Sequence, residues 1–189
     1  MKETHVAGWR EKRRVMRRYD LTADMYEERY AEEQRAKYRA ALENVTVAGG
    51  AVLDVGCGSG LFFSHVASCA SVVVAVDVSR RLLLKARGEA KMAGNVFVLQ
   101  ADADHLPFSN GFFDAVFTFT VLQNMPDPSQ TLGELKRVVA AGGIVVVTGL
   151  KKAFPLETFV DFLEGTSLQV ASFLDRDDLK CYVAVLIAK

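Results

Sequence analysis

The stretch VLDVGCGSGLF at residues 52–62 decides the fold of this 189-residue chain. A short apolar run ends here in an acid-containing tip, and three glycines with the spacing G-x-G-x-G follow before a helix-like segment. Glycine lets the backbone turn sharply and lets a ligand approach the main chain closely. In open α/β sheets, ligands bind at the carboxyl ends of the strands. The stretch therefore predicts a strand, a ligand-binding loop and a helix in succession.

Short apolar runs alternate with amphipathic stretches from residue 51 onward. This rhythm predicts an α/β fold, a doubly wound and mostly parallel sheet with helices on both faces. The last two runs are joined by a polar turn with no room for a helix, so they are expected to pair as an antiparallel hairpin. The predicted strands cover residues 51–55, 71–78, 95–101, 113–120, 143–150, 167–175 and 180–188, and the predicted helices cover 61–69, 79–93, 128–140 and 156–165.

The segment before this pattern has a different character. Residues 9–46 contain neither Gly nor Pro and place apolar groups at helical spacing, which predicts one or two helices. We therefore expect an N-terminal helical segment at residues 1–48 that serves as a lid, and one compact domain at residues 49–189. Residues 1–18 carry seven Lys and Arg against two Glu. Either a phosphate-binding arm or a solvated helix face explains that excess.

The overall composition is that of an ordinary globular protein. Lys and Arg number 23 and Asp and Glu number 23, so the net charge indicates no polyanionic partner. The three cysteines lack metal-ligand spacing and are expected to be reduced thiols, with no metal bound. No apolar run approaches the roughly 20 residues that cross a bilayer. The sequence therefore predicts a soluble, cytoplasmic protein without a membrane span.

The glycine spacing argues against a nicotinamide dinucleotide. Dinucleotide sites use G-x-G-x-x-G to set a pyrophosphate on a helix N-terminus, whereas Phe62 and Phe63 follow Gly60 in this chain. Asp54, just before the loop, would repel a phosphate but suits a cationic amine. The expected ligand therefore carries an amino group and a positively charged centre.

Two further acids follow the next two predicted strands. Asp77 ends the second strand, where an acid can accept hydrogen bonds from both hydroxyls of a ribose. A helix cap is the alternative role, but Ser79 is the better N-cap for the following helix. Asp102 lies at the tip of the next loop, where it can accept an adenine amino group while the backbone N–H of Ala103 reaches the ring.

These motifs, in this order and spacing, resemble those of the class I S-adenosylmethionine-dependent methyltransferases, especially the type 11 group similar to the ubiquinone/menaquinone methyltransferases. The resemblance extends from about residue 19 to the C-terminus. It implies a Rossmann-like seven-stranded sheet with an antiparallel last strand, S-adenosylmethionine as methyl donor, S-adenosylhomocysteine as product, and no metal. The residues that it implies for cofactor binding are Tyr19, Asp54, Gly56, Cys57, Gly58, Gly60, Asp77, Val78, Asp102, Ala103 and Phe119.

Two segments concern the part of the site that would hold the methyl acceptor. The run at residues 19–26 resembles the family's Y-D-x-x-A-x-x-Y segment, which folds over the cofactor. After the fourth strand many relatives read H-H-L/F-x-D, but this chain reads QNMPD at 123–127, so the obvious general base is missing. Gln123, Asn124 and Tyr26 are the candidates for positioning the acceptor. Turn formation explains the two amides equally well, and helix packing explains the tyrosine.

The methyl acceptor is left open by the sequence. Residues 150–165 leave room for only one helix, so either the N-terminal helices alone cover a small molecule or an open site receives RNA or protein. The sequence is also compatible with a homodimer, with an activating partner subunit, and with a non-catalytic cofactor-binding subunit. The intact glycines and acids argue against the last of these. Methyl transfer itself needs in-line positioning rather than a covalent intermediate.

Overall fold

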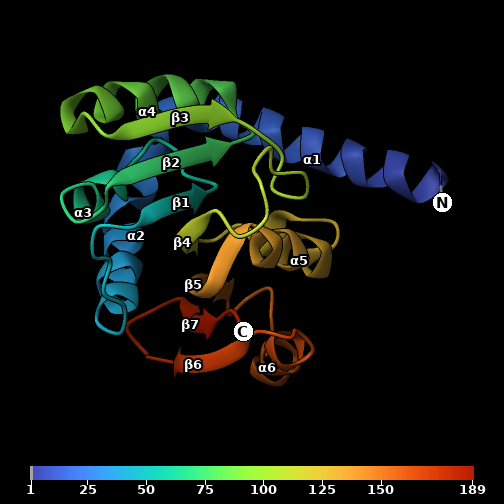
Figure 1. Ribbon diagram of the computed structural model, residues 1–189. Coiled ribbons are helices and arrows are strands. Elements are labelled where there is room, and N and C mark those ends of the chain that lie inside the picture. The colour runs from blue at the N-terminus through green and yellow to red at the C-terminus, as the bar shows by residue number, and fades with distance from the viewer. Residues whose placement is uncertain (1) are drawn as a thin grey trace.

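The computed structural model describes residues 2–189, with side chains from residue 8 onward. Within this range the seven predicted strands are present and form one sheet (Figure 1). The strands are β1 (Ala51–Val55), β2 (Val72–Asp77), β3 (Val96–Gln100), β4 (Phe113–Thr118), β5 (Val139–Leu150), β6 (Gln169–Leu174) and β7 (Cys181–Ile187). The helices are α1 (Lys2–Thr22), α2 (Tyr26–Leu42), α3 (Phe63–Val66), α4 (Arg80–Ala93), α5 (Pro128–Val138) and α6 (Leu156–Glu164), with 3-10 turns η1 (Ala23–Met25) and η2 (Leu122–Asn124).

The strand order confirms the predicted doubly wound topology. The sheet runs β3-β2-β1-β4-β5-β7-β6, and neighbours among β1 to β5 are parallel. β7 is antiparallel to both β5 and β6, which confirms the expected antiparallel last strand and terminal hairpin. The chain reverses its direction of progress between β1 and β4, and a crevice opens at such a switch point in α/β sheets.

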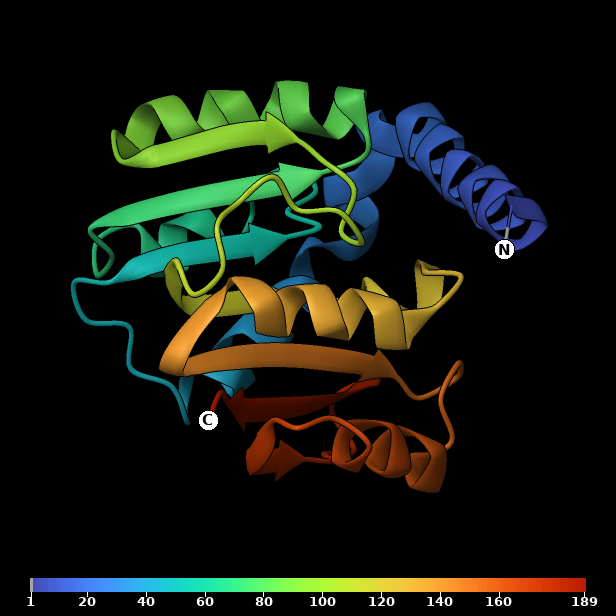
Figure 2. The ribbon, with the colours of Figure 1, turned by 45° about the vertical axis from the view of Figure 1, so that its right-hand side comes forward.

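Two layers of helices bury the two faces of this sheet (Figure 2). α2, α3 and α4 pack against one face in a cluster that includes Val52, Val73 and Phe117. α5 and α6 pack against the other face in a cluster that includes Leu53 and Val116. Successive strand residues point to opposite faces, so a strand covered on both sides must be apolar almost throughout. That requirement explains the continuous apolar runs of the sequence.

Two predicted elements differ in extent. The helix predicted over 61–69 is wrong in length, because only the four residues of α3 are helical. His65 and Cys69 donate their N–H groups three residues back instead of four, since the chain must turn to enter β2 at Val72. β5 begins four residues earlier than predicted. Its first residues include Gly142 and Gly143, and glycine weakens the strand pattern that a sequence presents.

The N-terminal segment forms two helices, as predicted, with a sharp joint at η1. Ala23 at this joint is fully buried. α1 lies across one end of the sheet and projects from the body at its N-terminal end, whereas α2 returns along the sheet (Figure 1). Among the described residues, no helix has the length and apolar character to span a membrane.

Candidate functional site

A cavity of about 810 Å³ lies at the carboxyl ends of β1, β2 and β4, where the topology predicts a ligand site. α1 and α2 supply its other wall. The sequence-predicted residues that line it are Tyr19, Tyr26, Gly56, Asp77, Val78, Ala103, Phe119, Gln123 and Asn124. The other predicted residues, Asp54, Cys57, Gly58, Gly60 and Asp102, lie around it without lining it.

Gly56 and Gly60 of the glycine loop exclude a side chain for different steric reasons. Gly56 has φ +77°, and a Cβ there would lie 2.2 Å from a methyl group of Val121 on the cavity wall. Gly60 has φ +91°, and a Cβ there would lie 2.7 Å from the Phe63 ring and 3.2 Å from the Cα of Ala86 in α4. Gly60 therefore permits the loop to pack on its own helices, and Gly56 borders the cavity.

Tyr26 lies over the glycine loop. A Cβ on Gly58 would lie 3.1 Å from the Tyr26 hydroxyl oxygen, so this tyrosine closes down on the loop itself. Its ring packs 5.2 Å from Tyr30 and 6.1 Å from Tyr19, centroid to centroid. Burial, with the charge of Asp77 nearby, raises the pKa of Tyr26 well above its usual range, so the hydroxyl stays protonated. Tyr26 thus adjoins the part of the site that the sequence assigns to the cofactor.

Asp77 braces the glycine loop from the end of β2. Its carboxylate accepts hydrogen bonds from the backbone N–H of Gly58 at 2.9 Å and of Ser79 at 2.8 Å. Burial raises its pKa despite these hydrogen bonds. A carboxylate has about four acceptor positions, so Asp77 retains acceptor capacity toward the cavity that it lines. Ser79 is the N-cap of α4, as predicted, and accepts from the Leu82 N–H at 3.2 Å.

Asp54 is a buried carboxyl group beneath the loop. Its Oδ2 atom has no hydrogen-bond partner among the described residues. Burial, with the charge of Asp77, raises the pKa of Asp54 to about 8. The neighbouring thiol of Cys57 is also buried, and burial raises its pKa well above the ordinary value, so the sulfur is neutral and unreactive.

Asp102 faces a lysine of α1. The Lys12 Nζ atom donates to both Asp102 oxygens, at 2.8 and 2.9 Å, and lies 2.5 Å from Asp104. Asp104 is also held by Thr131, which donates its hydroxyl proton at 2.5 Å. Adenine binding by Asp102 stays a prediction, and in this structure an ammonium group holds its carboxylate. Lys12 is therefore inward-facing and is not part of a solvated basic face.

The Y-D-x-x-A-x-x-Y segment at residues 19–26 holds the N-terminal helices against α4. Asp20 accepts the hydroxyl proton of Ser79 at 2.6 Å and the backbone N–H of Arg81 at 3.1 Å, at the positive end of the helix dipole. Asp24 pairs with the Arg81 guanidinium at 2.9 Å. These contacts give a structural reason for the acid in this segment, which the sequence could not supply.

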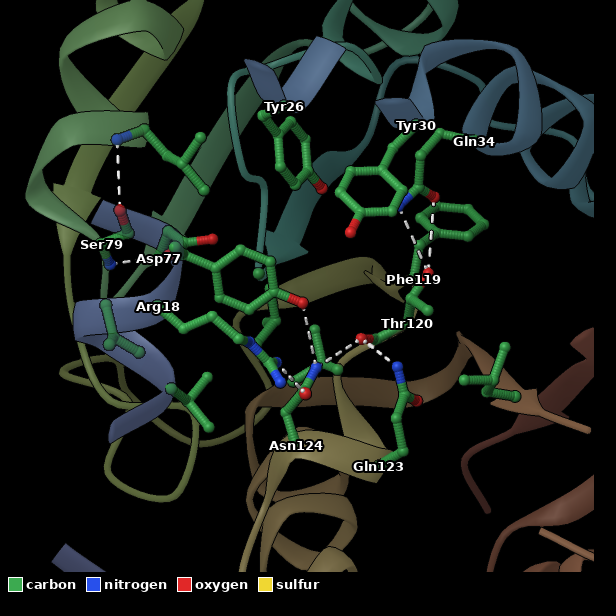
Figure 3. A pocket seen from close by; sticks show the side chains of 18 of the residues that line it. Arg18, Tyr26, Tyr30, Gln34, Asp77, Ser79, Phe119, Thr120, Gln123 and Asn124 are labelled. Atoms are coloured by element: carbon green, nitrogen blue, oxygen red, sulfur yellow. Dashed lines mark hydrogen bonds between the residues drawn. The ribbon is translucent and has the colours of Figure 1, made fainter. Parts of the chain in front are cut away.

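Gln123 and Asn124, which were predicted to position the acceptor, lie in η2, shortly after β4. Gln123 and Asn124 both donate side-chain N–H groups to the carbonyl oxygen of Thr120, at 2.6 and 3.0 Å (Figure 3). Thr120 has φ +63°, a conformation that costs roughly 1–3 kcal/mol for a residue other than glycine and is concentrated at functional sites. The Gln123 Oε1 atom is buried without a partner among the described residues. Gln123 is therefore held at the cavity wall by its side-chain N–H group, and its oxygen is enclosed by protein.

The sequence missed a polar cluster beside Thr120. Lys37 of α2 is only 1% exposed, and its ammonium group donates to the Thr120 hydroxyl at 3.1 Å and pairs with Glu33 at 2.9 Å. Gln34 lies 3.4 Å from the same hydroxyl (Figure 3). Partial burial opposes ionisation of Glu33, but hydrogen bonds from Lys37 and Lys180 outweigh it and lower its pKa. The spacing of Glu33 and Lys37 also fits an exposed helix-face pair, so the pattern gave no signal of burial.

The residues present fit S-adenosylmethionine. Asp77 lines the cavity with acceptor capacity that its backbone hydrogen bonds leave unused, and the loop leaves room for a ligand at Gly56. Asp54 lies outside the cavity lining, and its raised pKa keeps it protonated at neutral pH, so it supplies no charge to a cationic group. Among the side chains that the structure describes, residues 8–189, no group of three or more His, Cys, Asp or Glu is arranged to hold a metal ion.

Comparisons with known proteins show the family of the chain. The family model described as "Methyltransferase domain" matches residues 53–147. A chloroplastic methyltransferase of Arabidopsis thaliana is 32% identical over 141 residues, which are 70% of this chain and 40% of that protein. A demethylmenaquinone methyltransferase of Clavibacter sepedonicus is 38% identical over 103 residues, which are 53% of this chain and 41% of that protein. The chain thus spans about two fifths of the length of these relatives.

The fold also has a counterpart with its cofactor in place. Magnesium protoporphyrin IX methyltransferase from Synechocystis, whose structure holds bound S-adenosylmethionine, superposes with a TM-score of 0.77 over 95% of this chain and 97% of that chain. The two sequences are 15% identical, so the likeness concerns the fold. Because the family model covers the glycine loop, Asp77, Asp102 and β4 together, this chain belongs to the methyltransferase-domain family, in the class that uses S-adenosylmethionine.

Proposed function

We propose that this chain transfers a methyl group from S-adenosylmethionine to a small molecule held in the cavity. The observation that carries the proposal is that one cavity of about 810 Å³ joins Gly56 and Asp77 to Glu33, Thr120 and Gln123. Pockets for small molecules have volumes of roughly 300–1,000 Å³, so this volume suits a cofactor beside a small acceptor. A macromolecular acceptor would favour an open, flat site, which a cavity walled by α1 and α2 does not offer.

The cofactor side would be formed by Gly56, Asp77, Val78 and Ala103. When bound, S-adenosylmethionine supplies a methyl group on a sulfonium, which is a good leaving group. Asp77 would bind the ribose hydroxyls through its unused acceptor positions while it holds the loop through Gly58 and Ser79. Tyr26 would close the loop from above and exclude water.

The acceptor side would act by orientation. Gln123 and Asn124 are fixed to the strained Thr120 and would shape the wall against which the acceptor is oriented. Among the described residues that line the cavity there is no histidine, and Glu33 is a weak base because its pKa is lowered. The acceptor atom would therefore have to be nucleophilic without help from a strong general base.

We expect S-adenosylhomocysteine to bind with a micromolar dissociation constant, because the loop and Asp77 are already arranged. Isothermal calorimetry with S-adenosylhomocysteine and with NAD measures this. Binding of NAD without binding of S-adenosylhomocysteine or S-adenosylmethionine contradicts the proposal. A screen with labelled methyl donor against small-molecule extract, bulk tRNA and protein extract then tests the acceptor class, and label found in RNA or protein alone excludes the small molecule.

We further propose that residues 1–48 act as a lid. Lys12 would hold it through Asp102, and Asp20 would hold it through Ser79. Replacing Lys12 with methionine should speed amide hydrogen exchange in residues 8–18, because the two carboxylates at Asp102 and Asp104 lose their shared cation. Exchange near Asp20 should change little. Arg13→Gln, at an exposed position of the same helix, is the matched control. Unchanged exchange in Lys12→Met would show that other contacts hold α1 in place.

A further inference from the structure

The cavity wall has an excess of positive charge, although the chain as a whole has none. Of the side chains described, five cationic ones line the cavity, and the acidic ones are Glu33 and Asp77. Asp77 is on the cofactor side, engaged with two backbone N–H groups. Glu33 pairs with Lys37 and with Lys180, each at 2.9 Å. The cations left without an acidic partner among the described residues are Arg18, Arg29 and Lys152.

These three side chains come from three separate segments around the cavity. Arg18 belongs to α1, Arg29 to α2, and Lys152 follows β5. All three are solvent-exposed, so they lie at the mouth and not in the buried interior. Positive charges that converge at the mouth of a cleft attract an anionic ligand and raise its local concentration.

Arg18 is already held in place for such a ligand. Its Nη2 atom donates to the Asn124 side-chain oxygen at 2.7 Å, and its guanidinium lies 4.9 Å from the centroid of the Tyr19 ring (Figure 3). Asn124 is neutral, so this contact orients the guanidinium without cancelling its charge. A guanidinium has five N–H donors in a fixed plane, so further donors are available for a carboxylate or a phosphate. Asn124 is a positioning residue in this arrangement, because it acts through Arg18.

The body of the ligand would meet aromatic walls. Tyr26 and Tyr30 lie with ring centroids 5.2 Å apart, and Tyr19 and Phe119 line the same cavity. Flat side chains of this kind favour a flat, apolar ligand. We propose that the methyl acceptor is a small aromatic molecule with an anionic group, a carboxylate or a phosphate, and that Arg18, Arg29 and Lys152 select it. This inference rests on the proposed methyl transfer, since it names the substrate class of the same cavity.

The test uses the full chain saturated with S-adenosylhomocysteine and matched pairs of probes. Benzoate is paired with benzamide, naphthoate with naphthamide, and naphthyl phosphate with naphthol, so that each pair differs mainly in charge. Calorimetry and ligand-observed NMR should find at least one anionic probe bound about tenfold more tightly than its neutral partner at low salt. That preference should shrink at about 1 M salt, where the screening length falls to about 3 Å.

The double variant Arg29→Gln/Lys152→Gln should weaken the anionic probes about tenfold and leave their neutral partners within about twofold. Its affinity for S-adenosylhomocysteine should match the parent. Arg87→Gln/Lys91→Gln removes the same charge from exposed positions on α4 and should retain the preference. The carboxylate and phosphate pairs distinguish the two anionic groups.

The outcomes separate this inference from the proposed function. If S-adenosylhomocysteine does not bind, the proposed methyl transfer itself is wrong. If it binds but no anionic probe binds more tightly than its neutral partner, or the preference survives both in Arg29→Gln/Lys152→Gln and in the variant that also carries Arg18→Gln, the anionic acceptor is wrong. If bulk tRNA displaces the anionic probes and requires the same two residues, the charges serve a nucleic acid and the small-molecule acceptor is overturned.

Discussion

Replacing Asp77 with alanine is expected to weaken S-adenosylhomocysteine binding by more than about 1.5 kcal/mol, which is over tenfold in the dissociation constant. Two ribose hydroxyls would each lose a charged acceptor. The same change removes the acceptor for the backbone N–H groups of Gly58 and Ser79. A buried N–H left without a partner costs about 1–3 kcal/mol, so the free energy of unfolding should fall as well. Calorimetry measures the first effect and urea unfolding the second.

A matched variant separates the two effects. Asp114 accepts the backbone N–H of Ala51 at 2.8 Å, at the opposite end of β1 from the cavity. Because this hydrogen bond is solvent-exposed, Asp114→Ala should lower stability by less than Asp77→Ala, and it should not change the affinity for S-adenosylhomocysteine. If Asp77→Ala behaves in the same way, with reduced stability and the parent's affinity, then Asp77 only braces the loop and the ribose assignment is wrong.

Most of the fold could be predicted from the sequence because strands buried on both faces leave a strong pattern. Runs such as residues 71–78 and 180–188 are almost wholly apolar, and both became strands. The pattern failed to predict the extent of an element where burial of apolar side chains does not set that extent. The start of β5 contains Gly142 and Gly143, and α3 is cut short by the return to the next strand.

The candidate site was predictable only where residues follow strand ends. Gly56 and Asp77 lie directly after β1 and at the end of β2, so their place in the chain fixes their place in the fold. Contacts between segments that are distant in the sequence cannot be located in this way. Lys12 and Asp102 are 90 positions apart, and Lys37 and Thr120 are 83 positions apart. No local pattern shows that these pairs meet.

Asp54 should make the stability of the chain depend on pH, and Asp54→Asn should remove that dependence. The pKa of Asp54 is raised from 3.8 to about 8 in the folded protein, so the folded chain keeps a proton that the unfolded chain has released. Its contribution to stability is therefore fully present below about pH 4 and is lost as the pH rises toward 8. Between pH 5 and pH 7 the parent should lose about 2–3 kcal/mol of unfolding free energy relative to Asp54→Asn. Urea unfolding of both proteins at several pH values measures the difference.

Two further variants test whether Asp54 is the group responsible. Thr118→Val also alters a buried polar atom without a partner, on the adjacent strand, but it cannot titrate, so its effect on stability should be the same at every pH. Asp77→Asn removes a charge that helps raise the Asp54 pKa, so the pH dependence should become weaker without disappearing. A parent whose stability stays parallel to that of Asp54→Asn from pH 5 to 7 would show that Asp54 is already ionised. In that case a cationic neighbour or ordered water must compensate for its burial, because an isolated buried carboxylate is too costly to persist.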